Sequence, residues 1–125
     1  MEAVESSEIV PPKVFAHRAG WTRPERTSEG MREQNSIPRA KETLQEASGC
    51  EVDVGFTADG VAVVTHDSVS RLTLEQFKKA NPDHASLESW VGWFNTDDLK
   101  DKELYLDLKG TQQDSYRLVE LINTL

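Results

Sequence analysis

Two carboxylates, Glu51 and Asp53, stand two positions apart in a segment whose other members are Cys50, Val52 and Val54. On a β-strand, residues i and i+2 face the same side, so both carboxylates point one way while the apolar side chains point the other. Two like charges so close together repel unless a cation lies between them, and hard divalent ions take oxygen ligands of this kind. The pair therefore predicts a Mg²⁺ or Ca²⁺ site.

Other polar residues that could do chemistry stand at the ends of the remaining apolar segments. They are His17 with Arg18, His66 with Asp67, and Asp107 with Lys109. A single histidine at a strand end is more often a cap or a surface residue, and an isolated lysine there is an ordinary terminus. The joint pattern is more informative, because the carboxyl ends of parallel strands meet in the active site of an α/β barrel.

Together these residues suit the cleavage of a phosphodiester. Glu51, Asp53 and Asp107 offer oxygen ligands to a metal, which would polarise a phosphoryl oxygen. Arg18 and Lys109 bring positive charge to the other phosphate oxygens. The two histidines could divide the proton transfers between the nucleophile and the leaving oxygen.

The elements that must position these residues are predicted from hydrophobic pattern and from cap and turn residues. Residues 1–12 are predicted to be a polar lead-in, and residues 18–36 a long polar loop. The strands and helices alternate, which favours an α/β fold with a mostly parallel sheet, although the Asp59-Gly60 turn is too short to hold a helix. Strands are expected at 13–17, 50–55, 61–66 and 104–108, and helices at 37–48, 72–80, 87–94 and 116–125.

Composition narrows the function classes. The chain has 125 residues, enough for one domain, and a formal net charge of −8, which argues against a nucleic-acid partner. No apolar run reaches the ~20 residues of a membrane span, and the acidic N-terminus does not look like a signal peptide. The single cysteine, Cys50, is expected to be a buried thiol and excludes an internal disulfide. A cytoplasmic location is therefore expected.

Three stretches of the sequence carry a resemblance to the glycerophosphodiester phosphodiesterases. The first is Val14–Gly20 with its His-Arg pair, and the second runs from Glu51 through Thr57-Ala58-Asp59-Gly60 to His66-Asp67. The third is Leu106–Gly110, and the resemblance extends over about residues 13–125. It implies a (β/α)8 TIM-barrel fold, a glycerophosphodiester substrate cleaved to an alcohol and glycerol phosphate, and a divalent metal, Mg²⁺ or Ca²⁺.

The resemblance also implies a role for each matching residue. His17 and His66 would be the acid/base pair, Glu51, Asp53 and Asp107 the metal ligands, Arg18 and Lys109 the phosphate-binding residues, and Asn35 a supporting residue. Two positions depart from the family pattern. Gln34 stands where the family usually has glutamate, and the segment between His66-Asp67 and Leu72 is shortened to Ser68–Arg71.

The length of the chain leaves alternatives open. A barrel of this type takes ~250 residues, so residues 13–125 are expected to form a partial barrel of about four strands, whose open edges could allow self-association. One alternative is a truncated, catalytically inactive relative. Another is a lipid phosphodiesterase of the lysophospholipase D or sphingomyelinase D kind, acting on lysophospholipids or sphingomyelin. Trp21, Trp90 and Trp93 would then contact acyl chains, although ordinary packing is the favoured interpretation of these tryptophans.

Overall fold

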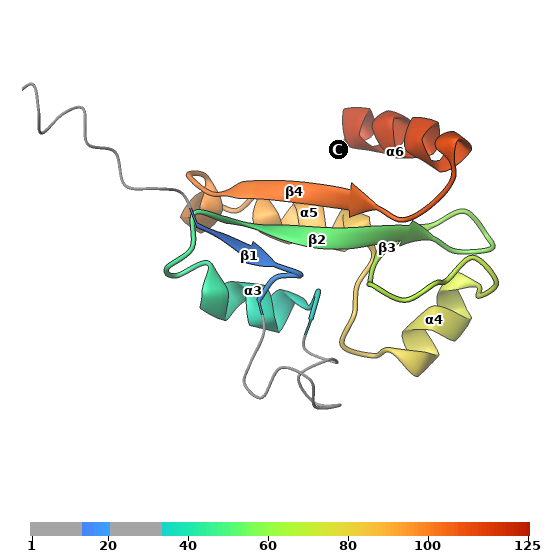
Figure 1. Ribbon diagram of the computed structural model, residues 1–125, viewed down its shortest axis with the longest axis horizontal. Helices are drawn as coiled ribbons and strands as arrows, with labels where there is room; N and C mark the ends of the chain where they lie inside the picture. Colours follow the sequence, from blue (N-terminus) through green and yellow to red (C-terminus); the bar gives the residue numbers. More distant parts are fainter. Residues whose placement is uncertain (1–13, 21–33) are drawn as a thin grey trace, which may run out of the picture.

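The computed structural model describes residues 14–20 and 34–125. The predicted lead-in at residues 1–12, most of the predicted loop and Trp21 lie outside these ranges. In chain order the elements are β1 (Phe15–His17), α3 (Ile37–Thr43), β2 (Gly49–Phe56), β3 (Ala62–Val64), α4 (Leu74–Ala80), α5 (Leu87–Phe94), the 3-10 helix η1 (Asp97–Leu99), β4 (Glu103–Leu108) and α6 (Gln112–Thr124) (Figure 1).

Strand β2 is the centre of the sheet that the described residues form (Figure 1). It pairs in parallel with β1, where His17 lies opposite Glu51, and in parallel with β4, where Asp53 lies opposite Asp107. Strands β1, β2 and β4 are thus the parallel strands of a partial (β/α)8 barrel, which confirms the predicted α/β fold class.

Strand β3 differs from the expected alternation, because it runs antiparallel to β2. The turn at residues 57–60 is closed by hydrogen bonds between Thr57 and Val61, and the chain folds back on itself as a hairpin. A connection this short cannot cross over to make a parallel neighbour. Among the described strands, β3 is therefore the hairpin partner of β2 and not a further parallel strand of the barrel.

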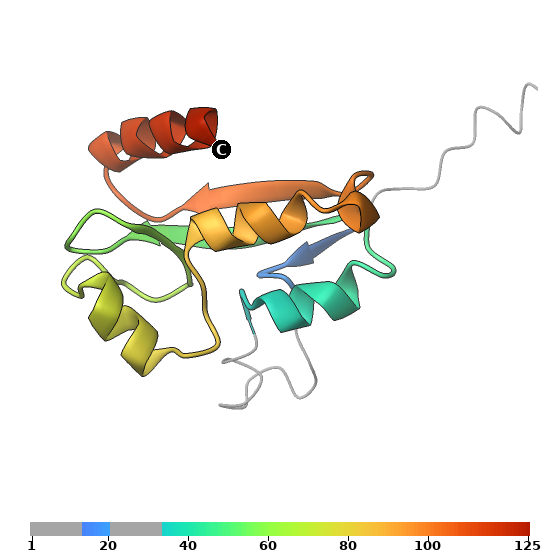
Figure 2. The ribbon, with the colours of Figure 1, turned by 180° about the vertical axis from the view of Figure 1, so that it is seen from behind.

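The two faces of β2 and β4 differ in the way that their alternation predicts. Cys50, Val52 and Val54 are fully buried and pack in one core with Ala40 of α3, Leu44 just after α3, and Leu87 and Trp90 of α5. Leu104, Leu106 and Leu108 of β4 pack against that core. Figure 2 shows α5 lying across the back of these strands. The acidic side chains therefore face away from the helices.

The helix boundaries follow local capping chemistry. The hydroxyl of Ser36 accepts from the Arg39 N–H at the start of α3, and Thr73 forms a capping box with Gln76 at the start of α4, as the predicted cap there requires. Such caps each contribute about 1 kcal/mol. Helix α6 starts earlier than predicted because Thr111 caps it. Helix α3 ends at Thr43 instead of Ser48 because the N–H groups of Gln45 and Glu46 bond three residues back instead of four.

The β4 side of the sheet carries exposed apolar side chains. Helix α6 has no buried residue, and its Tyr116, Val119 and Ile122 are exposed. These exposed apolar side chains offer a surface for the expected self-association through open sheet edges. The self-association itself remains a prediction. Among the described residues, no helix combines the length and the apolar character needed to cross a membrane.

Candidate active site

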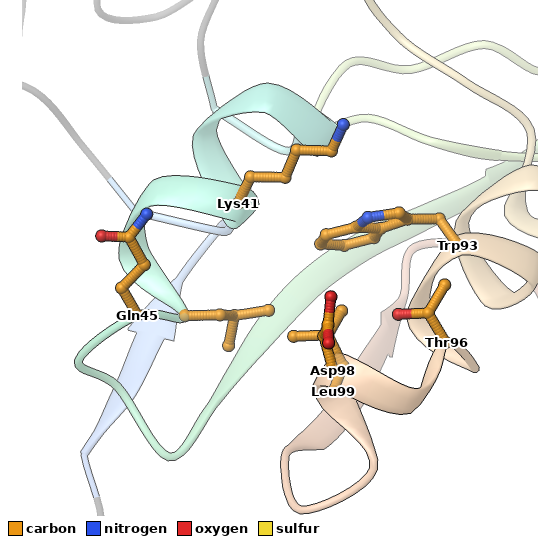
Figure 3. A pocket seen from close by; sticks show the side chains of 7 residues that line it. Lys41, Gln45, Trp93, Thr96, Asp98 and Leu99 are labelled. Carbon is orange, nitrogen blue, oxygen red and sulfur yellow. The ribbon is translucent and has the colours of Figure 1, made fainter.

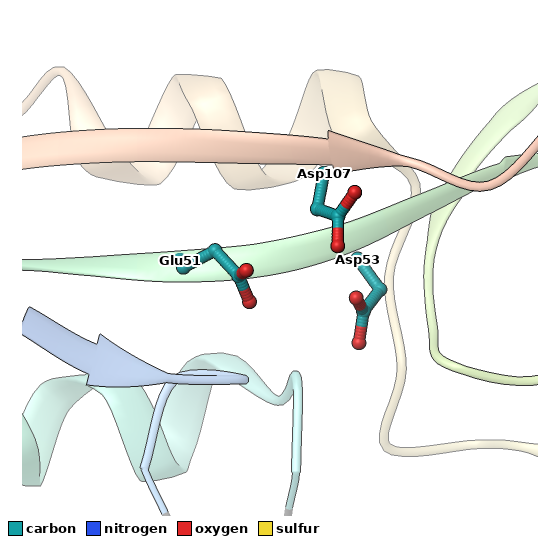
Figure 4. A group of neighbouring side chains, drawn as sticks. All are labelled: Glu51, Asp53 and Asp107. Atoms are coloured by element: carbon teal, nitrogen blue, oxygen red, sulfur yellow. The ribbon is translucent and has the colours of Figure 1, made fainter.

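Three carboxylates meet on the face of the sheet opposite α5. Glu51 and Asp53 come from β2, and Asp107 comes from β4, where it is the direct neighbour of Asp53. One oxygen of each carboxylate lies within 4.8 Å of the others, and Figure 4 shows the three side chains grouped along these two strands. The structure thus brings together the predicted metal ligands, from positions more than fifty residues apart in the chain.

Asp53 is the centre of this group and is only 1% exposed. Burying a carboxylate is costly unless charged and hydrogen-bonding partners surround it. Its Oδ2 accepts from Asn35 Nδ2 at 3.1 Å and lies 3.4 Å from both Arg18 Nε and His66 Nδ1. Its Oδ1 lies 3.9 Å from Lys109 Nζ. These partners compensate the buried charge and hold it in one orientation.

Asn35 binds Asp53 through both ends of its amide. Besides the bond to the carboxylate, its Oδ1 accepts from the backbone N–H of Asp53 at 3.0 Å. Asn35 is 1% exposed and has a φ of 61°, a left-handed conformation that asparagine tolerates better than most residues. The supporting position predicted for Asn35 is therefore a direct, two-point contact with the most buried carboxylate.

Lys109 and Asp107 form a more exposed pair at the end of β4. Lys109 Nζ lies 2.9 Å from Asp107 Oδ2, and the two side chains are 48% and 42% exposed. The pKa of Lys109 is raised because its ammonium donates a hydrogen bond to Asp107 and is attracted to that carboxylate. Lys109 is therefore a cation at neutral pH, in a position that solvent and a phosphate can reach.

The two predicted acid/base histidines stand beside different carboxylates. His17 Nε2 lies 3.6 Å from Glu51 Oε1, and His66 Nδ1 lies 3.4 Å from Asp53. Both rings are substantially exposed, at 59% and 42%. His66 lies beside Asp53 because β3 folds back along β2, and the Thr65 N–H donates to Asp53 O at 3.0 Å. The structure places His66 beside Asp53, but at the return of an antiparallel hairpin and not at the end of a parallel strand, as the sequence pattern predicted.

The chain that follows β1 is bent sharply around the acids. Arg18 and Ala19 have φ values of 52° and 64°, which are uncommon for residues other than glycine, and Ala19 N–H donates to Glu51 O at 3.0 Å. Gly20 follows with a φ of 105°, and a Cβ there would collide with Thr43. Left-handed residues of this kind cluster at functional sites, where the surroundings hold them in place.

The donor set fits a hard divalent cation. All three groups are carboxylates, which is the ligand type that Mg²⁺ and Ca²⁺ prefer. Glu51 Oε1 is buried and has no hydrogen bond among the described residues, so an acceptor is left without a donor next to the other two acids. The cations near Asp53 and Asp107 offset part of the negative charge, whereas the group beside Glu51 Oε1 is His17, at 3.6 Å.

Two hollows open on either side of His66 and Asp67. One, of about 330 Å³, is also lined by Lys109, Gly110 and Thr111, and the other, of about 140 Å³, lies toward Asn35 and His84. Substrate groups bound at the acids would thus have space on both sides of His66.

A further hollow, of about 340 Å³, lies away from the acids between α3 and the α5–η1 segment (Figure 3). It is lined by Lys41, Gln45 and Trp93, together with other residues of these elements. None of the residues predicted for catalysis, metal binding or phosphate binding contributes to it, and it belongs to the helical side of the sheet.

Two residues near the site were not assigned a role from the sequence. Gln34 accepts from Arg18 NH1 at 3.2 Å through its side chain, so the residue that replaces the usual glutamate contacts the predicted phosphate-binding arginine. His84 contacts the backbone of Gln34 at 3.1 Å and is buried. No spacing in the sequence points to His84, because it lies in an irregular linker between two helices.

Comparisons with known proteins support the resemblance. No family model matches the sequence, and no curated protein matches it. A solved glycerophosphodiester phosphodiesterase from Parabacteroides distasonis is similar to it with a TM-score of 0.69 and 26% identity, over 90% of this chain and 51% of that chain. Glycerophosphodiester phosphodiesterases from Agrobacterium tumefaciens (TM-score 0.66, 18% identity, 91% and 53%) and Thermotoga maritima (0.65, 19%, 93% and 52%) have the same fold over a similar extent.

The chain therefore spans about half the length of the solved structures that it matches. The expected likeness to glycerophosphodiester phosphodiesterases is confirmed, as is the partial barrel. The predicted domain boundaries at residues 1–12 and 13–125 remain predictions.

Proposed function

We propose that this chain provides the metal-binding and proton-transfer half of a phosphoric diester hydrolase that cleaves glycerophosphodiesters to an alcohol and glycerol phosphate. The observation that carries the proposal is the meeting of Glu51, Asp53 and Asp107 beside two histidines and Lys109, on one face of this sheet. The likeness to solved glycerophosphodiester phosphodiesterases supports the choice of substrate class.

Glu51, Asp53 and Asp107 would hold the divalent ion, Mg²⁺ or Ca²⁺. When bound, such an ion polarises a phosphoryl oxygen and offsets the charge that develops during displacement. Asp53 enters this task already fixed by Asn35, whereas Asp107 shares its Oδ2 with Lys109. The lysine would therefore have to move or share Asp107 when the ion binds.

Arg18 and Lys109 would bind the phosphate group. Lys109 is the more accessible of the two, and its raised pKa keeps it charged over the whole neutral range. Arg18 is held by Asp53 and Gln34, so its charge is fixed beside the acids. The ammonium of Lys109, after β4, and the oriented guanidinium of Arg18, after β1, would thus approach a bound phosphate from the ends of different strands.

The histidines would transfer the protons. Because Asp53 lies 3.4 Å from His66 Nδ1, the carboxylate favours the tautomer with a proton on Nδ1 and leaves Nε2 able to take or give a proton at the substrate. His17 stands beside Glu51. One ring would take the proton of the attacking hydroxyl while the other protonates the leaving oxygen of the alcohol.

The decisive test is hydrolysis of glycerophosphocholine and glycerophosphoinositol by the purified chain with Mg²⁺ or Ca²⁺. Glu51→Gln removes a ligand charge without changing the size of the side chain, and it should weaken metal binding at least tenfold. Glu75→Gln, on the exposed first turn of α4, is the matched control and should change nothing. Unchanged metal binding by Glu51→Gln would mean that the acids have a purely structural role.

A catalytically inactive relative is the alternative that an observation favours, because the chain spans only about half of the structures that it matches. Such a protein would bind the metal weakly or not at all. Thermal melting with and without Mg²⁺ separates the two at the level of binding, since a ligand that binds only the folded state raises the transition. The lipid alternative has less support, because Trp90 is fully buried in the core and packs edge-on against Trp93 at 5.5 Å.

A further inference from the structure

We infer that His84, in the linker between α4 and α5, is a positioning residue of the acidic site that acts through the Gln34–Asn35 peptide group. Its effect on metal binding rests on the proposed function. Its effect on the conformation of Asn35 does not, and it can be measured without any metal.

Within residues 14–20 and 34–125, His84 makes one side-chain hydrogen bond, which joins its Nε2 to the backbone oxygen of Gln34 at 3.1 Å. A carbonyl oxygen can only accept, so Nε2 carries the proton. The ring is itself held in place. It packs edge-on against Phe77, the His84 N–H donates to Asn81 O at 3.1 Å, and the His84 O accepts from Lys78 Nζ at 3.2 Å. His84 is 9% exposed, so this donor reaches Gln34 from a rigid, largely dry position.

The bond matters because of the peptide group that it holds. Gln34 O and Asn35 N belong to one planar unit. The His84 ring donates to the Gln34 oxygen of this unit, and the Asn35 N–H of the unit donates to Arg18 O at 2.6 Å. The plane is thus fixed at both ends, and the left-handed φ of Asn35 follows from that plane. Without the histidine, the oxygen of this unit would lose the donor that His84 provides.

The orientation of this peptide group decides where the Asn35 amide points. The amide makes both of its contacts with Asp53, at 3.1 Å to the carboxylate and 3.0 Å to the N–H. Asp53 is the buried carboxylate of the three. A residue in the α4–α5 linker therefore reaches a proposed metal ligand through two peptide-linked residues and three hydrogen bonds.

The test uses three variants of the full chain. His84→Phe keeps an aromatic ring against Phe77 but has no donor. His84→Gln can place an amide donor near the position of Nε2. Phe77→Leu weakens the same packing while leaving the donor, and it serves as the control for general destabilisation.

The first measurement is amide hydrogen exchange and the side-chain NH₂ resonances of Asn35 by NMR, without metal. His84→Phe should accelerate exchange of the Asn35 N–H about tenfold and shift its NH₂ resonances, since a buried acceptor loses its donor. His84→Gln should stay within about threefold of the unmodified chain. Equal exchange in His84→Phe and the unmodified chain would overturn the inference, as would a change just as large in Phe77→Leu.

The second measurement is titration of each variant with Mg²⁺ and Ca²⁺. His84→Phe should weaken binding about tenfold, as substitutions behind metal ligands do, and His84→Gln should restore it. If the unmodified chain binds neither ion, the proposed function fails while the exchange data still decide the role of His84. If His84→Phe does not fold, the ¹⁵N shifts of His84 in the unmodified chain decide it: a protonated Nε2 supports the inference, and a bare Nε2 refutes it.

Discussion

The contact between Asn35 and Asp53 gives the sharpest prediction on stability. Replacing Asn35 with glycine keeps the left-handed backbone available and removes both hydrogen bonds of the amide. The bond to the carboxylate is worth about 2 kcal/mol and the bond from the Asp53 N–H about 1 kcal/mol. Asn35→Gly should therefore lower the free energy of unfolding by about 3 kcal/mol.

Urea unfolding at neutral pH without metal measures this loss. For a chain of this size, about 3 kcal/mol corresponds to a fall in melting temperature on the order of 10–15 °C. Asn95→Gly is the matched control, because it adds the same flexibility to the unfolded chain at an exposed residue that caps the end of α5. It should cost less than about 1 kcal/mol. If both variants lose the same stability, the buried amide contributes nothing and the reasoning about Asp53 is wrong.

Three further outcomes are expected. Lys109→Met should reduce turnover of a glycerophosphodiester at least tenfold, because a phosphate-binding cation is lost. Calorimetry should find metal binding no weaker, because Asp107 is freed from the ammonium 2.9 Å away. Weaker metal binding would contradict the assignment of Lys109 to the phosphate. Burial raises the pKa of Cys50 to about 12, so its thiol should resist a thiol reagent at pH 8 in the folded chain and react on unfolding; fast reaction of the folded chain would contradict its burial. The pKa of Asp59 is lowered chiefly by the hydrogen bond from Thr57. The contribution of Asp59 to stability is therefore present above the ordinary aspartate pKa of ~3.9 and is lost as the pH falls through its lower folded value. Asp59→Asn should reduce the loss of unfolding free energy at acid pH, and an unchanged dependence of that free energy on pH would refute this.

The sequence alone was sufficient for features that depend on local pattern. Alternation along 50–54 placed Glu51 and Asp53 opposite the core, because side chains on a strand alternate whatever the strand pairs with. The end of α4 at Asn81-Pro82 was also predictable, and α5 has the boundaries that its pattern predicts. These features depend on residues within a few positions of one another.

Other features depended on partners distant in the sequence. The direction of β3 is not one of these features, because the turn at 57–60 is too short for a crossover; the apolar residues at 61–64 alone suit either direction. The contacts of Asn35 and His84 join segments that share no periodic pattern, so their spacing carries no signal. Asp107 could be named from the sequence as a polar residue at the end of an apolar segment, but not as the neighbour of Asp53. Its place beside Asp53 follows from the register of two parallel strands.

The β2–β3 hairpin also bears on how the site forms during folding. It brings His66 to Asp53 through contacts between neighbouring parts of the chain, within residues 49–67. Hairpins form in about 1–10 μs, long before sheets that depend on distant strands. The carboxylates of β2 and the ring of His66 can thus be assembled as a unit early, and β4 then adds Asp107 and Lys109 to a geometry that already exists.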